Sequence, residues 1–199
     1  ESFNKVIKRI FDLTFSLVII IGLLSWLLPI MAVIIKLDSK GPVFFIQKRN
    51  GLKYKKFNCY KFRSMELNDN SDVELASKND LRITKVGKFI RKTSMDELPQ
   101  FFNVFFGEMS IVGPRPHMVS VANIYAAKVD KFMVRHFVKP GITGLAQTKG
   151  YRVEVETDEH IINRVKYDIF YIENWSVLLD IKIIFITVFN TLRGDKKAY

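Results

Sequence analysis

The sequence is poor in cysteine and histidine, which limits the kinds of site that it can build. The single cysteine, Cys59, excludes an internal disulfide and fits the reducing environment of a cytosolic face. The three histidines, His117, His136 and His160, show no spacing typical of zinc ligands. The sequence also lacks repeats, low-complexity tracts and linkers, so we expect a single domain over residues 1–199.

Acidic residues are scarce relative to basic ones. The chain carries 31 Lys or Arg against 20 Asp or Glu, a formal net charge of +11. The first 65 residues hold 12 basic and 3 acidic residues, whereas the remainder holds 19 and 17. A basic surface attracts phosphate groups of nucleic acids, anionic lipids or nucleotides. Nucleic-acid binding would rest on net charge alone, and the near-neutral second part of the chain disfavours it.

One long apolar segment lies near the N-terminus. Residues 17–35 contain no charged side chain, and a helix of that length rises about 28 Å, close to the thickness of a hydrocarbon core. A signal peptide is disfavoured because the segment is too long and no small-residue cleavage site follows. A buried helix of a soluble core is disfavoured because the segment is apolar all round.

Basic residues flank this segment on both sides, although the positive-inside rule places them on one side of a membrane. Pro29 would break the helix by removing a backbone hydrogen bond to the carbonyl of Ser25, and the hydroxyl of Ser25 could satisfy freed backbone groups. We therefore predict a re-entrant helix–break–helix over residues 10–37. A kinked single span is the alternative, and the sequence barely separates the two.

The rest of the chain predicts a mixture of short strands and helices. Strands are expected within residues 39–51, 57–65 and 139–152, and helices over 83–91, 99–106, 120–138, 157–173 and 177–193. The last two of these are amphipathic, and the helix over 99–106 is apolar enough to suit a lipid interface. The predicted fold class is α+β, mainly helical with a small β element, an N-terminal re-entrant membrane helix and amphipathic interfacial helices.

Residues 93–106, TSMDELPQFFNVFF, place two adjacent carboxylates before a run of phenylalanines. Ser94 and Glu97 match a capping box, which would start a helix there. Pro99 fits the first helical position better, which leaves Asp96 and Glu97 in the preceding turn as candidate catalytic groups. The phenylalanines suit either a lipid interface or a soluble core; the apolar N-terminal segment favours the interface.

The stretch SIVGPRPHM brackets Arg115 between Pro114 and Pro116. Two prolines fix the backbone on both sides of one guanidinium. A backbone held rigid in this way suits bidentate phosphate binding, for which arginine has a better geometry than lysine.

Seven sequence blocks follow one another along the chain: KRIFD, GPVFF.Q.R.G, YKFRSM, DELPQ, NV..G.MS.VGPRP, VKPGITG.AQ and YI.NWS..LD.KI. Together they resemble the bacterial sugar transferases, the monotopic phosphoglycosyl transferases, over about residues 8–192. The C-terminal blocks look most like the branch that uses UDP-hexoses for exopolysaccharide. The resemblance implies transfer of a sugar phosphate from a UDP-sugar to polyprenol phosphate (undecaprenyl phosphate), through a covalent phosphosugar–aspartate and with UMP as product.

By the same resemblance, Asp96 is the nucleophile and a Mg²⁺ ligand, with Glu97 as its partner. The other implied roles are phosphate binding by Lys61, Arg91 and Arg115, donor binding by Pro116 and Arg152, and a membrane helix break at Ser25 and Pro29. Residues 38–199 would form the catalytic and interfacial part on the cytoplasmic face of a bacterial inner membrane. The partners implied are the UDP-sugar, polyprenol phosphate and membrane lipid.

Some questions stay open at this level. The sugar, the polyprenol length and the oligomeric state, including a homo-oligomer, cannot be read from these residues. A non-catalytic basic module that binds membrane surfaces is the alternative function. It accounts for the charge of the first 65 residues and for the amphipathic helices, but not for the acidic pair or for the Pro-Arg-Pro stretch.

Overall fold

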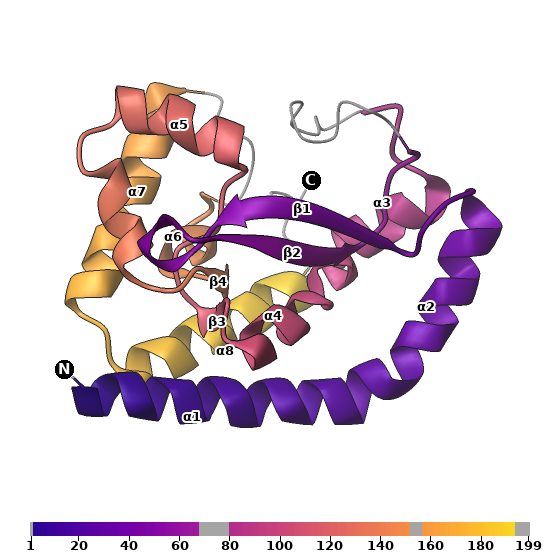
Figure 1. Ribbon diagram of the computed structural model, residues 1–199, viewed down its shortest axis with the longest axis horizontal. Coiled ribbons are helices and arrows are strands. Elements are labelled where there is room, and N and C mark those ends of the chain that lie inside the picture. The colour runs from indigo at the N-terminus through magenta and orange to yellow at the C-terminus, as the bar shows by residue number, and fades with distance from the viewer. Residues whose placement is uncertain (1, 68–79, 152–156, 194–199) are drawn as a thin grey trace.

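The computed structural model describes residues 2–67, 80–151 and 157–193. Its N-terminal part is one long helix with a bend (Figure 1), formed by α1 (Ser2–Ile19), a wide π-helical turn (Ile20–Leu24) and α2 (Ser25–Asp38). Within the described residues, this is the one helix, Phe3–Asp38, that is long and apolar enough to cross a membrane.

The helix departs from α geometry just before Ser25 and not at Pro29. The amide of Ser25 donates to the carbonyl of Ile20, five residues earlier, and its hydroxyl donates to the carbonyl of Ile21 over 2.5 Å. Pro29 lies inside α2. The predicted break is therefore displaced upstream, and Ser25 satisfies the carbonyl of Ile21 instead of freed groups at its own position. A π-helical turn is a common cause of a sharp bend.

The strands form two separate pairs. β1 (Phe44–Asn50) and β2 (Lys56–Phe62) pair antiparallel, from Phe44 opposite Phe62 to Asn50 opposite Lys56. A 3-10 turn (Leu52–Tyr54) joins them. β3 (Ser110–Val112), which the sequence did not predict, pairs parallel with β4 (Gly141–Thr143).

Most of the remaining described chain is helical. The helices are α3 (Lys85–Lys92), α4 (Gln100–Phe106), α5 (Val119–Lys128), α6 (Leu145–Thr148), α7 (Asp158–Glu173) and α8 (Val177–Arg193). Two further 3-10 segments are η3 (Met95–Glu97) and η4 (Phe132–Phe137). The stretch predicted as one helix over 120–138 is thus two, because Lys131 adopts the left-handed conformation between them. The predicted α+β class is confirmed.

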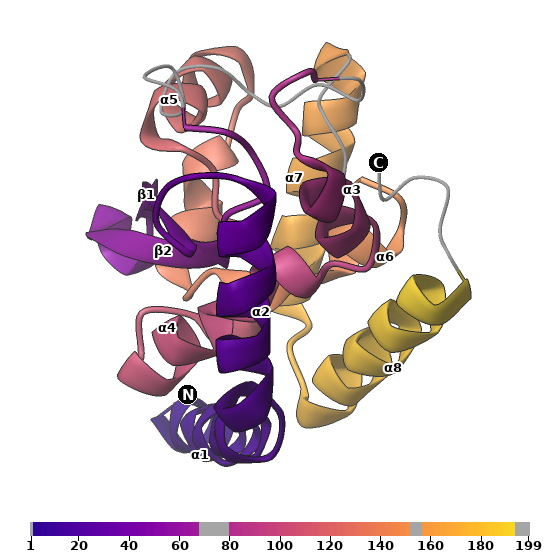
Figure 2. The same cartoon turned by 90° about the vertical axis from the view of Figure 1, so that its right-hand side faces the viewer.

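Both arms of the bent helix pack against the rest of the molecule (Figure 2). The main core joins Leu24 of the wide turn to Phe101 and Val104 of α4 and to Ile183 of α8. A second cluster packs one face of α2 against β2 and α3; its buried members are Leu27, Met31, Ile35, Phe62 and Ile90.

Polar contacts also connect α1 to the body. The buried carboxylate of Asp12 accepts hydrogen bonds from the hydroxyl of Ser110 and the amide of Ile111, each at 3.0 Å. Arg9 donates to the carbonyls of Val104 and Phe105, each at 2.7 Å. The middle of α1 is therefore fixed to both α4 and β3.

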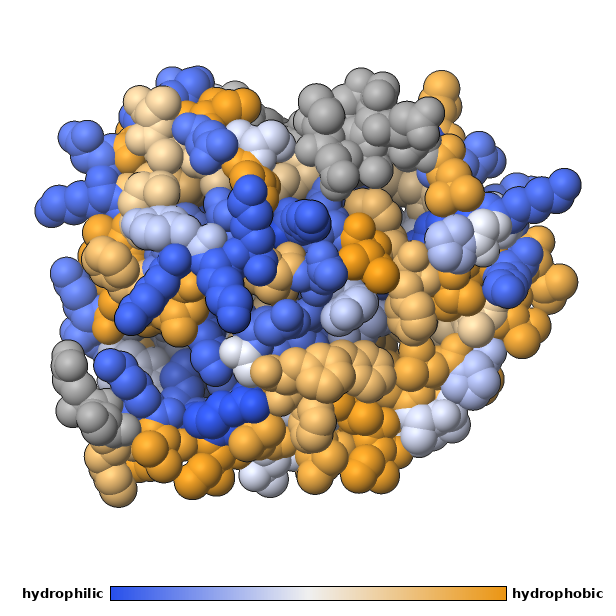
Figure 3. All heavy atoms as spheres, in the orientation of Figure 1, coloured by the Kyte–Doolittle hydropathy of each residue, from blue (hydrophilic) through white to orange (hydrophobic). Residues whose placement is uncertain are grey.

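Apolar side chains are exposed along much of this bent helix. Figure 3 shows them along α1 at the lower edge and over α2 at the right, with hydrophilic side chains across the middle. The face predicted on α8 is also exposed, with Phe185 at 73% and Leu178 at 78%. The phenylalanines of α4 divide, since Phe101 is 9% exposed and Phe106 is 66% exposed. The core interpretation thus holds for Phe101, and the lipid-interface interpretation stays a prediction for the exposed Phe106.

Candidate active site

Asp96 and Glu97 lie in the short turn η3, between α3 and α4, as the position of Pro99 predicted. Pro99 directly precedes α4, whereas the prediction made it the first residue of that helix, a difference of one position. Ser94 has φ +59° and makes no capping hydrogen bond, so the capping box does not form. A left-handed non-glycine residue beside two carboxylates is the kind of strain found at functional sites. Both acids are nevertheless buried, at 8% and 5% exposure.

Two cations hold the carboxylate of Glu97. Nζ of Lys61 lies 2.9 Å from its Oε1, and Nη2 of Arg115 lies 2.7 Å from the same oxygen. Lys61 also lies 3.9 Å from Oδ2 of Asp96. The structure therefore brings four of the predicted residues together, two acids and two cations, which gives a compact site with charge of both signs.

Different elements deliver these side chains. Lys61 projects from β2, the acids come from η3, and Arg115 follows β3 after a close turn at Gly113. A Cβ added to Gly113 would lie 2.6 Å from the carbonyl oxygen of Lys139, so only glycine fits there. The predicted rigid mount of Arg115 therefore depends on a glycine as well as on the two prolines.

Two further arginines hold the backbone directly after the Arg115 side chain. Arg49 donates to the carbonyl of Pro116 over 2.5 Å, and Arg135 donates to the carbonyl of Arg115 over 2.8 Å. Arg135 is paired in turn with Asp168 at 2.7 Å, and both side chains are 3% exposed. Burial raises the pKa of the Asp168 carboxyl, and the two neighbouring guanidinium groups oppose that shift.

The other predicted site residues are placed less directly. Arg91 lies in the last turn of α3, which packs against η3. Pro116 contributes the carbonyl that Arg49 contacts. Arg152 lies outside the described residues.

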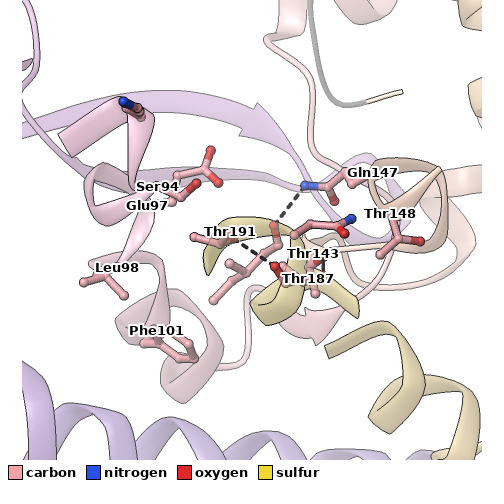
Figure 4. A pocket seen from close by; sticks show the side chains of 12 residues that line it. Ser94, Glu97, Leu98, Phe101, Thr143, Gln147, Thr148, Thr187 and Thr191 are labelled. Atoms are coloured by element: carbon pink, nitrogen blue, oxygen red, sulfur yellow. Dashed lines mark hydrogen bonds between the residues drawn. The ribbon is translucent and has the colours of Figure 1, made fainter. Parts of the chain in front are cut away.

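A cavity of about 100 Å³ adjoins this site on the side of α6 and α8, and Glu97 is part of its wall. Figure 4 shows Ser94 and Glu97 on one side of it, with Gln147, Thr187 and Thr191 across from them. We call it the threonine cavity after its members Thr143, Thr148, Thr187 and Thr191; its other lining residues are Lys92, Ser94, Glu97, Leu98, Phe101, Ile142, Gln147 and Asn190.

In the part of the chain that the structure describes, no three His, Cys, Asp or Glu side chains gather as a protein-only metal site would require. Mg²⁺ needs no such cage, because it is commonly bound through one or two carboxylates together with substrate phosphates and water. The adjacent carboxylates of Asp96 and Glu97 fit that type of donor set.

Comparison with known proteins gives the family. The model of the bacterial sugar transferases matches residues 3–194, nearly the whole chain. The chain belongs to the bacterial sugar transferase family. The sequence resemblance is thus confirmed.

Several relatives of this sugar transferase have names that state an activity. It is 54% identical, over 98% of its length, to the UDP-glucose:undecaprenyl-phosphate glucose-1-phosphate transferase of Klebsiella pneumoniae, and covers 42% of that protein. It is 44% identical to a UDP-N-acetylgalactosamine-undecaprenyl-phosphate N-acetylgalactosaminephosphotransferase of Aeromonas hydrophila. That match covers 94% of this chain and 44% of the relative. It is 43% identical to the exopolysaccharide production protein PSS of Rhizobium leguminosarum bv. phaseoli, a match that covers 97% of this chain and 98% of the relative. The chain thus spans less than half the length of the first two.

Sequence reasoning missed the supporting residues of this sugar transferase. Arg49 and Arg135 contact the backbone around Arg115 from 66 and 20 residues away in the chain, and Asp168, 53 residues away, pairs with Arg135. Arg49 stands within one of the family blocks, but nothing in that block indicates its target. Only the folded arrangement shows that these side chains meet the Pro-Arg-Pro stretch.

Proposed function

We propose that the chain is a phosphoglycosyl transferase that moves a sugar phosphate from a UDP-sugar to undecaprenyl phosphate. The products are undecaprenyl diphosphosugar and UMP, and the reaction begins exopolysaccharide or glycoconjugate assembly. The observation that carries the proposal is the buried pair Asp96–Glu97 in contact with Lys61 and Arg115. The activities named for the Klebsiella and Aeromonas relatives support it.

In the first step, a carboxylate oxygen of Asp96 attacks the phosphorus that bears the sugar. A bond forms between that oxygen and the phosphorus, and the bond from the phosphorus to the bridging oxygen breaks, which releases UMP. Carboxylates are known nucleophiles toward phosphoryl groups. In the second step, a phosphate oxygen of undecaprenyl phosphate attacks the same phosphorus, and Asp96 leaves as a free carboxylate.

The cations of the site would offset the repulsion between the Asp96 carboxylate and the diphosphate. A carboxylate that approaches a diphosphate meets like charge, which positive groups fixed in advance can offset. Lys61 and Arg115 lie at 2.9 and 2.7 Å from Glu97 and so are already held beside the nucleophile. Glu97 would keep Lys61 and Arg115 oriented. When the substrate phosphates bind, these two cations would transfer some of their hydrogen bonds from Glu97 to the phosphate oxygens.

Mg²⁺ is the cofactor that this donor set would take, with Asp96 as its principal protein ligand. When bound, the ion would neutralise charge on the diphosphate oxygens. Removal of divalent ions with EDTA should therefore suppress turnover, and addition of Mg²⁺ should restore it.

The apolar surface supports a place at a membrane. We propose that residues 10–37 enter the bilayer and return to the cytoplasmic face of the inner membrane, with the bend near Ser25 at the deepest point. The exposed side chains of α1, α2 and α8 would contact lipid, while residues 38–199 would hold the site at headgroup depth. This arrangement would bring a water-soluble donor and a lipid acceptor to one carboxylate in turn.

The decisive experiment uses UDP-sugar labelled in the sugar. The wild-type chain, reconstituted in lipid, should form an acid-stable adduct with the label, and the Asp96→Asn variant should form none. Glu97→Gln should greatly reduce turnover while the donor still binds. Full adduct formation in Asp96→Asn would disprove the covalent role, and a wild type that binds lipid without any reaction would favour the non-catalytic membrane module.

A further inference from the structure

The threonine cavity lies beside the acidic pair, yet the chemistry above uses only one of its residues, Glu97. It is bounded by η3 and the start of α4 on one side and by α6 and the last turns of α8 on the other (Figure 4). The polar side chains on the α6 and α8 side come from segments far from Asp96 in the sequence. Their existing hydrogen bonds determine which donor and acceptor positions remain for a ligand.

The threonine hydroxyls have already used their protons. The hydroxyls of Thr143 and Thr187 lie 2.6 Å apart, and Thr143 is the donor when Thr187 donates to a backbone carbonyl. Thr187 donates to the carbonyl of Ile183 over 2.8 Å, Thr191 donates to the carbonyl of Thr187 over 2.9 Å, and Thr148 donates to the carbonyl of Leu145 over 2.8 Å. A hydroxyl has one donor and two acceptor positions. Thr148 and Thr191 therefore present acceptor capacity to the cavity, whereas Thr187 already accepts a hydrogen bond from Thr143.

Gln147 adds a stronger acceptor. Its Nε2 donates to the carbonyl of Ile142 over 3.3 Å, which orients its Oε1 away from that carbonyl. Among the described residues, neither this buried Oε1 nor the buried hydroxyl of Ser94 has a hydrogen-bond partner. A buried acceptor without a partner is costly, and a ligand that donates to it would remove that cost.

This pattern selects the chemistry of the occupant. A phosphate group only accepts hydrogen bonds from protein donors, so an acceptor-rich cavity with the Glu97 carboxylate in its wall disfavours it. A prenyl chain would leave Oε1 of Gln147 unpaired. A hexose has several hydroxyl donors and an apolar face, and Leu98, Phe101 and Ile142 supply apolar wall for that face. Lys92 and Asn190 add donors, and Lys92 is exposed to solvent.

We infer that the threonine cavity binds the hexose of the UDP-sugar donor, and that Gln147 and Thr191 help to determine which sugar is accepted. The inference rests on the proposed function and deepens it. Glu97 follows Asp96 in the chain and lines the cavity, so a sugar held there would have its phosphate end toward the acidic pair.

The test measures donor binding separately from turnover. Gln147→Met and Thr191→Val keep the approximate shape of each side chain and remove its acceptor. Thr14→Val is the control, since Thr14 is exposed on α1, far along the chain from the cavity. Each change is placed in the Asp96→Asn background for calorimetric titration with UDP-glucose, UDP-galactose and UDP, and in the active protein for UMP release.

Loss of one hydrogen bond predicts roughly three- to tenfold weaker binding of the preferred UDP-sugar for each cavity variant. Binding of UDP should stay unchanged, because it lacks the sugar, and the preference between the two epimeric sugars should narrow. The Thr14→Val control should match the parent with all three ligands. In the active protein, the KM for the donor should rise more than kcat falls.

Three outcomes would overturn the inference. Equal weakening of UDP and UDP-sugar would place the nucleotide in the cavity or indicate general damage. A change confined to the KM for undecaprenyl phosphate would place the acceptor there. Unchanged binding and epimer preference in both variants would show that the cavity does not contact the sugar. The proposed function fails separately if the unmodified protein binds UDP-sugar yet releases no UMP, since the binding titrations still test the cavity.

Discussion

Arg135 donates a hydrogen bond from Nη2 to the backbone carbonyl of Arg115, 2.8 Å away. The contact is to the main chain, so the guanidinium of Arg115 stays directed at Glu97. Asp168 completes the arrangement by pairing with Arg135 at 2.7 Å. A buried ion pair thus supports a residue of the candidate site without touching the acids of the site.

Asp168→Asn should destabilise the fold, because it leaves the buried guanidinium of Arg135 without its counter-charge. Loss of one partner of a buried pair typically costs about 3–5 kcal/mol. Thermal unfolding of the detergent-solubilised protein measures the effect. Asp158→Asn is the matched control, since its pair with Lys128 is on the surface, and its midpoint should scarcely move. Equal midpoints for the two variants would contradict the role assigned to the buried pair.

Arg115→Lys should lower kcat at least tenfold even though the positive charge remains. The guanidinium contacts both oxygens of Glu97, at 2.7 and 3.4 Å, and a lysine cannot reproduce this two-nitrogen contact. UMP release with a saturating donor is the readout. Lys88→Arg, at an exposed position of α3, is the control: it exchanges lysine and arginine outside the candidate site and should leave kcat unchanged. Unchanged kinetics in Arg115→Lys would show that charge alone suffices.

The two buried histidines should make the protein less stable as the pH is lowered from about 6.5 towards 4. Burial, assisted by the nearby charge of Arg135, lowers the pKa of His136 to about 4, and burial also lowers the pKa of His117. Between these pH values, the unfolded chain binds protons that the folded chain does not, so acid favours unfolding. Unfolding midpoints measured across this range should change less steeply in His136→Gln. An identical slope in that variant would exclude His136 as a contributor.

Phe101 and Phe106 should respond differently to truncation, although they are five residues apart on the same short helix. Phe101→Ala opens a hole in the core and should cost about 3–5 kcal/mol of folding stability. Phe106 is 66% exposed, so Phe106→Ala should leave the unfolding midpoint nearly unchanged and weaken binding to lipid vesicles. Co-sedimentation with vesicles gives the second readout. Strong destabilisation by Phe106→Ala would show that this ring belongs to a protein interface.

A re-entrant helix places both of its ends on the same side of the membrane. Lys5→Cys and Ser39→Cys, introduced singly, should both be labelled by a membrane-impermeant maleimide added to inverted inner-membrane vesicles. Cys59 is buried and should remain unlabelled, which provides an internal control. Labelling of one site only in inverted vesicles, and of the other only in intact spheroplasts, would establish a single span.

Local patterns predicted most of the elements. A Gly-Pro turn before a short apolar run predicted β1, and alternation predicted β2. The apolar faces of two amphipathic helices predicted α7 and α8, and the position of Pro99 placed the acidic pair in a turn. These features depend on near neighbours in the chain, which is why a single sequence suffices for them. The acids and the cations of Lys61 and Arg115 were also found, but through family blocks more than through spacing.

The features that escaped prediction depend on distant partners. β3 is three residues long and exists because β4, about 30 residues later, pairs with it. The bend just before Ser25 involves a widened turn, whereas the sequence signal was the proline one turn downstream. The cavity beside Glu97 requires that α8 return to η3, a closure that no local pattern encodes.

Asp12 accepts hydrogen bonds from Ser110 and Ile111, shortly before the turn that carries Arg115. If α1 lies in the bilayer as proposed, this contact would couple the tilt of the helix to the position of the Arg115 guanidinium relative to the lipid headgroups. Bilayer thickness should accordingly act as a tuning variable for catalysis, with thinner or thicker synthetic lipids shifting the rate even when both substrates are in excess.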